Sequence, residues 1–336
     1  MPLTPNVAEI DHAARLLRVG RLVAFPTETV YGLGANALDA DAVARIYIVK
    51  RRPPTSPIIV HVASIEMAQS LVAAWPENAE RLARKFWPGP LTMVLPTARV
   101  GADASVRPTE RSSAGLSSAR TIPLIVTAGL PTVGLRMPAH PVALALIRAA
   151  GVPLAAPSAN RFTELSPTTT DHVLRSLGND VDYILDGGSC QVGIESTVLS
   201  LVEPQPVLLR PGGISRRDLE SVVGPIGIAS DPSAGSHPAP GMHARHYSPR
   251  TSLFLISNGK LPEQGQGIYL QHATPPNRTA VVREMPHSAN DYAAALYREL
   301  HDADEFNFDW IAVDVPPAGP EWEAVHDRLR RAASKP

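Results

Sequence analysis

The sequence has little cysteine, no long apolar run and almost no net charge. Its single cysteine, Cys190, excludes an internal disulfide framework and fits a reducing compartment such as the cytoplasm. No stretch reaches the roughly 18 consecutive apolar residues that a membrane-spanning helix needs, and we expect no signal peptide. A formal net charge of -1 gives the protein no overall attraction to nucleic acid or to an acidic membrane. We therefore expect a cytoplasmic protein without a membrane partner.

The common nucleotide-binding signatures are also weak or missing. No G-x-x-x-x-G-K-[ST] motif occurs, although the run Gly32-Leu-Gly-Ala-Asn-Ala37 matches the dinucleotide pattern G-x-G-x-x-A. That pattern should follow its strand directly and be followed by an acid, yet residues 26–31 intervene and the later region carries Lys50, Arg51 and Arg52. The two glycines equally fit a bulge or a tight turn.

Proline is abundant, with 34 among 336 residues, and predicts short elements. Apolar periodicity predicts helices and strands that alternate, which is typical of an α/β protein. Helices are expected at 7–19, 39–50, 64–75, 77–86, 140–150, 168–178, 215–224, 289–302 and 320–333. Strands are expected at 21–27, 57–62, 90–96, 132–138, 152–160, 182–188, 196–202, 206–212, 252–257, 267–271, 279–285 and 310–316.

Composition divides the chain into two units. Residues 225–250 are rich in Pro, Gly, Ser and His, which is typical of a linker. We therefore expect a mixed α/β domain over 1–224 and a smaller α/β domain over 251–336. A second irregular stretch, 98–121, is expected to be an exposed loop.

Positive charge gathers in two windows of this nearly neutral chain. Residues 42–65 contain no Asp or Glu but include Lys50, Arg51 and Arg52, and residues 111–163 again lack acids but include Arg136. Such clustering suits a ligand that carries phosphate or carboxylate groups. The alternative is that the Lys50–Arg52 run is a solvated helix end that the helix dipole favours.

Several polar segments have both a structural and a functional interpretation. The segments APSAN (156–160) and GIESTV (193–198) adjoin predicted strands, where Ser, Asn and Glu form either turns or a binding site. His61 alternates with apolar residues, as a structural histidine does, and Cys190 lacks a neighbouring base and is expected to be a packed residue. His243 and His246 lack a nearby third ligand, which makes a zinc site improbable.

Taken in order, eight motifs resemble one family. The segments FPTETVYGLGANA, KRRPPTSPIIVHV, FWPGPLTMVLP, TVGLRMPAHP, APSAN, GIESTV, LLRPGGI and APGMHARHYSP are similar to those of the threonylcarbamoyl-AMP synthases, in their long two-domain form. The resemblance implies a YrdC-like first domain with an open, twisted mixed sheet, and a Rossmann-like C-terminal domain. It also implies a nucleotidyltransferase that makes L-threonylcarbamoyladenylate from L-threonine, bicarbonate and ATP, with release of pyrophosphate, for threonylcarbamoyladenosine modification of tRNA.

The resemblance also assigns residues to roles. Those expected to hold L-threonine and its carbamate are Thr29, His61, Arg136, Ala156 and Ser196. Those expected to contact ATP are Arg52, Ser56, Thr132, Ser158, Ser166, Arg210 and Tyr247, and the catalytic set would be Lys50, Arg52, Ser158 and Asn160. Gly32 and Gly34 would let the chain turn back under the ligand, and residues 240–249, with His246 and Tyr247, would close over the cavity as a lid. Mg²⁺ is expected to arrive with ATP, without a dedicated protein metal site.

The remaining partners follow from the same resemblance. The product would pass to the tRNA threonylcarbamoyl-transfer machinery, with weak or indirect contact to tRNA itself. Two other functions stay open at this stage: a carbamoyl-transfer enzyme with another acceptor, and an RNA-binding module. The net charge of -1 and the lack of aromatic residues among the basic runs weigh against RNA binding.

Overall fold

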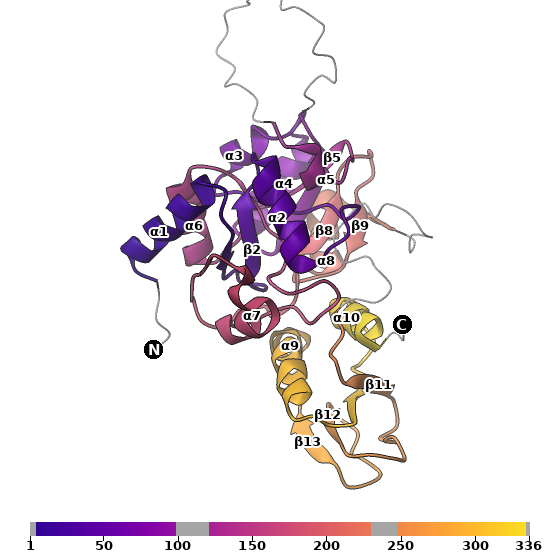
Figure 1. The fold of residues 1–336 in the computed structure, drawn as a ribbon. Helices are drawn as coiled ribbons and strands as arrows, with labels where there is room; N and C mark the ends of the chain where they lie inside the picture. Colours follow the sequence, from indigo (N-terminus) through magenta and orange to yellow (C-terminus); the bar gives the residue numbers. More distant parts are fainter. Residues whose placement is uncertain (1–4, 99–120, 230–246, 334–336) are drawn as a thin grey trace, which may run out of the picture.

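Two β-sheets organise the protein. The structure, a computed structural model, describes residues 5–98, 121–229 and 247–333. A ten-stranded mixed sheet belongs to the first domain, and a four-stranded parallel sheet belongs to the C-terminal domain (Figure 1). This confirms the expected combination of an open mixed sheet with a smaller Rossmann-like unit.

The large sheet joins strands that are far apart in the sequence. Its spatial order is β10-β9-β8-β4-β5-β3-β6-β2-β1-β7, with both parallel and antiparallel pairs. The strands are β1 (Val23–Phe25), β2 (Gly32–Asn36), β3 (Val60–His61), β4 (Leu91–Pro96), β5 (Thr132–Arg136), β6 (Leu154–Ala155), β7 (Tyr183–Ile184), β8 (Thr197–Ser200), β9 (Val207–Arg210) and β10 (Gly227–Ile228). None exceeds six residues, which agrees with the high proline content.

Helices pack around this sheet, and several of them begin at a side-chain cap. They are α1 (Val7–Arg18), α2 (Ala40–Lys50), α3 (Ile65–Gln69), α4 (Glu77–Phe86), α5 (Leu124–Thr127), α6 (Pro141–Ala150), α7 (Thr170–Leu177), the 3₁₀ turn η1 (Gly178–Asp180) and α8 (Arg216–Val223). In α7 the Thr169 side chain accepts from the N–H of His172, and Gly178 ends the helix, as the sequence predicts. In α2, Asp39 caps the start and Arg51 ends the helix in the left-handed conformation, with φ 53°.

Tertiary pairing shortens one predicted helix. The sequence predicts a helix over 64–75, but α3 ends at Gln69. Beyond it, Val72 forms a β-bridge with Thr97, and the N–H of Ala73 donates to the carbonyl of Pro96 at 2.9 Å. Pairing with the end of β4 therefore replaces the last predicted turns.

The C-terminal domain follows its predicted order closely. Its strands β11 (Ser252–Ile256), β12 (Gly267–Gln271), β13 (Val281–Glu284) and β14 (Trp310–Asp314) lie in the order β11-β14-β12-β13 and are all parallel. Helices α9 (Ala289–Glu305) and α10 (Glu323–Ala333) lie between this sheet and the first domain (Figure 1). The predicted linker, 225–250, includes β10, and its residues 230–246 lie outside the described part of the chain. Residues 99–120 of the predicted exposed loop also lie outside the described part.

The two domains share an apolar interface. Val30, Leu165 and Ile194 of the first domain belong to the same buried cluster as Leu296 and Val325 of the C-terminal domain. The main core of the first domain is a separate cluster on the large sheet, and a third packs α1 and α6 against its edge. Apolar burial therefore fixes α9 and α10 against the first domain.

Candidate functional site

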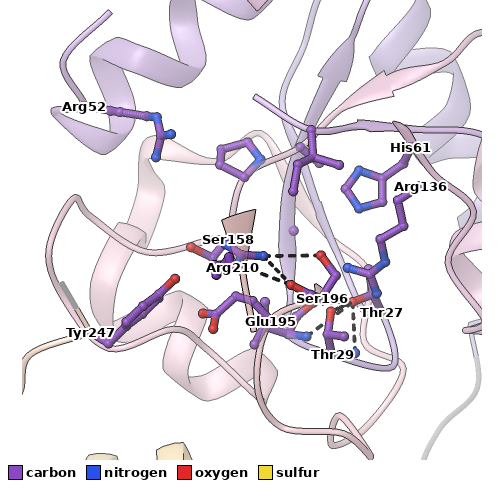
Figure 2. Close-up of a pocket in the computed structure, with 15 residues that line it drawn as sticks. Thr27, Thr29, Arg52, His61, Arg136, Ser158, Glu195, Ser196, Arg210 and Tyr247 are labelled. Atoms are coloured by element: carbon purple, nitrogen blue, oxygen red, sulfur yellow. Dashed lines mark hydrogen bonds between the residues drawn. The ribbon is translucent and has the colours of Figure 1, made fainter. Parts of the chain in front are cut away.

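A cavity that is partly open to solvent lies where several strands of the large sheet end. The segment after β1, the end of β5, the residues after β6, those before β8 and the end of β9 all contribute (Figure 2). The lining residues are Thr27, Thr29, Val30, Gly32, Arg52, Ile59, His61, Arg136, Ala156, Pro157, Ser158, Glu195, Ser196, Arg210 and Tyr247. Nine of the predicted site residues are thus brought together: Thr29, Arg52, His61, Arg136, Ala156, Ser158, Ser196, Arg210 and Tyr247.

His61 and Arg136 form one end of the cavity (Figure 2). They sit opposite each other in the paired strands β3 and β5, and both are almost fully buried. The Nη2 of Arg136 donates to Glu28 at 2.7 Å, and the second oxygen of Glu28 accepts from the N–H of Ala139 at 3.0 Å. Burial, reinforced by the charge of Arg136, lowers the pKa of His61 to about 3, so the ring is neutral at physiological pH.

Two polar atoms at this end are left without a hydrogen-bond partner. Arg136 Nε and His61 Nδ1 are both buried, and neither has a partner within the described part of the chain. Leaving a buried donor unpaired costs about 1–3 kcal/mol. Two such atoms in one cavity are of the kind that an ordered water or a polar ligand completes.

The threonines after β1 form a compact turn at the same end. The hydroxyl of Thr27 donates to the carbonyl of Val30 at 2.7 Å and lies 2.8 Å from the hydroxyl of Thr29. The same Thr27 oxygen accepts from the N–H groups of Thr29 and Val30. This local bonding holds Thr29 in place on the cavity wall.

The two glycines of this region serve close packing rather than a turn. Gly32 and Gly34 lie in β2, which pairs antiparallel with β1, so the prediction of a turn at these positions is wrong. A Cβ on Gly34 would lie 2.7 Å from Cε1 of Phe25, so only glycine fits there without movement. The chain reverses in residues 26–31, before the glycines.

Arg52 and Tyr247 lie at the opposite end, with Arg210 between (Figure 2). Arg52 is 7% exposed and its Nη2 donates to the carbonyl of Pro57 at 3.0 Å. Burial lowers its pKa to about 10, which still leaves the guanidinium charged near neutral pH. The Nη2 of Arg210 donates to the carbonyl of Ser196 at 2.8 Å. Three guanidinium groups therefore face one cavity, which favours an anionic ligand.

Five predicted site residues do not line the cavity: Lys50, Ser56, Thr132, Asn160 and Ser166. The buried ammonium of Lys50 donates to the carbonyl of Ser158 at 2.6 Å, and also to the carbonyl of Asn160. Burial lowers its pKa well below the ordinary value, and nearby Arg52 adds to this. Lys50 thus holds the 158–160 turn in place without lining the cavity itself.

The other four have different surroundings. The carbonyl of Ser56 accepts from Tyr47 at 2.9 Å, and the Asn160 amide donates to the carbonyl of Glu164 at 2.8 Å. Thr132 begins β5 and lies about 13 Å from Arg136 at its end, because four residues of strand rise about 3.3 Å each. Ser166 is fully buried and its hydroxyl donates to Glu195 Oε1 at 2.5 Å.

Glu195, which the sequence left open as part of a turn or of a binding site and gave no role, belongs to the site. Its carboxylate lines the cavity and accepts from Arg328 Nε at 2.7 Å and from the hydroxyl of Tyr297 at 3.1 Å. Burial raises its pKa, but the attraction of Arg328 and Arg210 and the bond from Ser166 outweigh burial, and the pKa lies below its ordinary value. The signal in the sequence was an acid directly before Ser196, inside a motif already assigned to the site.

The described residues also bear on two other kinds of site, a metal site and a reactive cysteine. Among residues 5–98, 121–229 and 247–333, no group of three or more His, Cys, Asp or Glu could hold a metal ion. His243 and His246 lie outside these ranges. Cys190 is buried and desolvation raises its pKa, as expected of a packed thiol. No helix in the same ranges is long and apolar enough to cross a membrane.

Comparisons with known proteins match both domains. A family model described as telomere recombination covers residues 15–212, and one described as threonylcarbamoyl-AMP synthase, C-terminal domain, covers 214–334. The threonylcarbamoyl-AMP synthase of Bacillus subtilis is 40% identical, over 98% of this chain and 94% of its own length. That of Pyrococcus abyssi is 38% identical, over 97% of this chain and 94% of its own length.

A solved structure agrees with these relatives. The crystal structure of P. abyssi Sua5 complexed with L-threonine superimposes with a TM-score of 0.85 at 38% identity, over 96% of this chain and 94% of that one. The name of these relatives specifies an enzyme with an AMP-linked product, which is a nucleotidyltransferase-type activity. The full-length matches favour this activity over carbamoyl transfer to another acceptor and over an RNA-binding module. The chain belongs to the threonylcarbamoyl-AMP synthase family.

Proposed function

We propose that the cavity converts L-threonine, bicarbonate and ATP to L-threonylcarbamoyladenylate and pyrophosphate. The observation that carries this proposal is the pair of unpartnered buried atoms, Arg136 Nε and His61 Nδ1, in a cavity faced by three guanidinium groups. A ligand with a carboxylate at one end and phosphates at the other matches this distribution of donors.

L-Threonine binds at the Arg136 end. The guanidinium is already fixed by Glu28, and its Nε can donate to the amino-acid carboxylate. His61 is neutral, so it adds a hydrogen bond without adding charge. Thr29, Ala156 and Ser196 line the same cavity and complete the predicted threonine set. The P. abyssi complex with L-threonine supports this choice of ligand.

ATP binds at the Arg52 end, with Arg210 and Ser158 close to its phosphates. Threonine and bicarbonate form a carbamate with loss of one water molecule. A carbamate oxygen then bonds to the α-phosphorus, and the bond between the α- and β-phosphates breaks to release pyrophosphate. No protein nucleophile is required, so the chain contributes orientation and neutralisation of charge. Arg52 and Arg210 supply the positive charge, and Lys50 acts indirectly by holding the 158–160 turn.

Mg²⁺ would arrive as a complex with ATP rather than in a protein-built site. The carboxylate that lines the cavity, Glu195, is already engaged by Arg328, Tyr297 and Ser166, and Glu28 is engaged by Arg136. The described donor set therefore fits a metal carried by the nucleotide. When bound, Mg²⁺ would neutralise phosphate charge.

The product belongs upstream of tRNA modification. A threonylcarbamoyladenylate is a mixed anhydride that water hydrolyses, so it must pass quickly to the tRNA threonylcarbamoyl-transfer machinery. Contact with tRNA itself is weak or indirect. A cytoplasmic location, expected from the single cysteine, is part of the same proposal.

Pyrophosphate release tests the proposal directly. With ATP and Mg²⁺ present, release should require L-threonine and bicarbonate together, because the carbamate is the attacking group. Mass spectrometry should detect an AMP-linked product in the same reactions. Arg136→Met should raise the KM for threonine much more than the KM for ATP. Equal release with threonine omitted would indicate plain nucleotide hydrolysis and would overturn the proposal.

A further inference from the structure

Arg328 of the C-terminal domain is buried against the cavity of the first domain. It lies on α10, has 0% exposure and is the largest fully buried side chain among the described residues. Its Nε donates to Glu195 at 2.7 Å, its Nη1 to Asp327 at 2.6 Å and its Nη2 to the carbonyl of Pro211 at 3.1 Å. The guanidinium also lies 5.0 Å from the ring centre of Tyr247.

Because Glu195 lines the cavity, its contact with Arg328 affects the binding site and does not only join the two domains. Glu195 lines the cavity that the phosphates of ATP would occupy, and its carboxylate carries negative charge there. Two of its partners, Arg328 and Tyr297, come from the C-terminal domain, and the neutral hydroxyl of Ser166 is the third. Arg328 therefore supplies the cationic hydrogen bond to this carboxylate.

A second cation acts on the same carboxylate. Arg210 also lowers the pKa of Glu195, and Arg210 lines the cavity directly. If Arg328 were removed, the carboxylate would turn toward Arg210 or remain as an uncompensated charge. Both outcomes oppose the binding of an anion beside Arg210.

We propose that Arg328 is a positioning residue that neutralises Glu195 and thereby keeps the nucleotide end of the cavity attractive to anions. The C-terminal domain would then complete the electrostatics of the active site through one side chain. This inference rests on the proposed function, because it takes ATP as the anion.

The test measures ATP binding by calorimetry and steady-state kinetics in the full chain. Arg328→Met should weaken ATP binding at least about ten-fold, because Glu195 is left charged and unpaired. Adding Glu195→Gln removes that charge, so the double variant E195Q/R328M should bind ATP within about three-fold of E195Q. Arg328→Lys keeps the charge and should recover part of the loss. The loss should appear in KM for ATP more than in KM for L-threonine.

Arg331→Met is the matched control. Arg331 lies one turn further along α10 and donates to Asp327 at 2.9 Å, without a described contact to Glu195. Circular dichroism and thermal melting of every variant report whether the chain remains folded.

Each result has a distinct meaning. Absence of ATP binding by the unmodified protein would overturn the proposed function itself. If the unmodified protein binds ATP but R328M binds equally well, the positioning role is wrong. If E195Q/R328M is as defective as R328M, or R331M shares the defect, Arg328 acts only as a bond between domains. An R328M chain that does not fold leaves the comparison of E195Q/R328M with E195Q as the deciding measurement.

Discussion

Replacing Arg52 by alanine is the sharpest test of the nucleotide end. Arg52 is 7% exposed, lines the cavity and directly follows Arg51, which ends α2 in the left-handed conformation and is exposed. The two adjacent arginines therefore differ in direction: one faces the proposed phosphate site and the other faces solvent. Both carry the same charge, so the pair separates a specific contact from a general electrostatic effect.

The expected magnitude follows from the contact that is lost. A charge-assisted hydrogen bond to phosphate contributes about 1.5–3 kcal/mol, which corresponds to a loss of roughly ten- to a hundred-fold in kcat/KM. Arg52 also donates to the carbonyl of Pro57, and leaving that buried group unpaired costs about 1–3 kcal/mol of stability. Arg51→Ala, at an exposed position, should change stability by less than about 0.5 kcal/mol and leave kcat/KM nearly unchanged.

Pyrophosphate release with saturating L-threonine and varied ATP measures both variants. Thermal melting separates catalytic loss from unfolding. If Arg51→Ala proved as damaging as Arg52→Ala, the assignment of Arg52 to the phosphate site would be refuted. An Arg52→Ala variant with normal KM and kcat for ATP would refute it equally.

Two further predictions concern stability. Gly34→Ala forces a Cβ to within 2.7 Å of Cε1 of Phe25 and should lower the free energy of unfolding by about 1–3 kcal/mol in denaturant titrations. A Cβ at Gly32 would meet its nearest atoms at 3.4 Å, so Gly32→Ala should destabilise the protein less. Equal losses of stability would contradict the packing argument. Burial lowers the pKa of His172 to about 3 and that of His301 to about 4 in a stacked pair between α7 and α9, with centroids 3.8 Å apart. Because the folded state disfavours protonation, this stability is complete above pH 6.5 and falls as the pH drops toward 4, by about 2 kcal/mol for each histidine between pH 7 and pH 5. His301→Phe should flatten the decline of the melting temperature, and an unchanged slope would refute the role of the pair.

The sequence predicted the helices and strands better than the residues at which they begin and end. All four strands of the C-terminal domain and the caps of α7 appeared where periodicity and Thr169 placed them. The helix expected over 64–75 stopped early because Ala73 pairs with Pro96, a contact made across the sheet. Local propensity carries no information about such a partner.

Some of the predicted site residues likewise lie where the sequence placed them, and others do not. Nine of the residues that the ordered motifs predict line one cavity. Thr132 does not, because it begins the strand that Arg136 ends. The family resemblance placed Lys50 in the catalytic set, and its ammonium donates to the backbone carbonyls of Ser158 and Asn160. The sequence left Glu195 open between a turn and a binding site, because Arg328, which stabilises its charge there, lies 133 residues away.

That separation has a consequence for the order of events during synthesis. A chain leaving the ribosome exposes every strand from β1 to β9 well before it exposes α10. Until α10 emerges, Glu195 lacks the hydrogen bond from Arg328 and keeps only its first-domain neighbours, Ser166 and Arg210. Capture of nucleotide by the growing chain should therefore lag behind assembly of the large sheet until α10 has emerged.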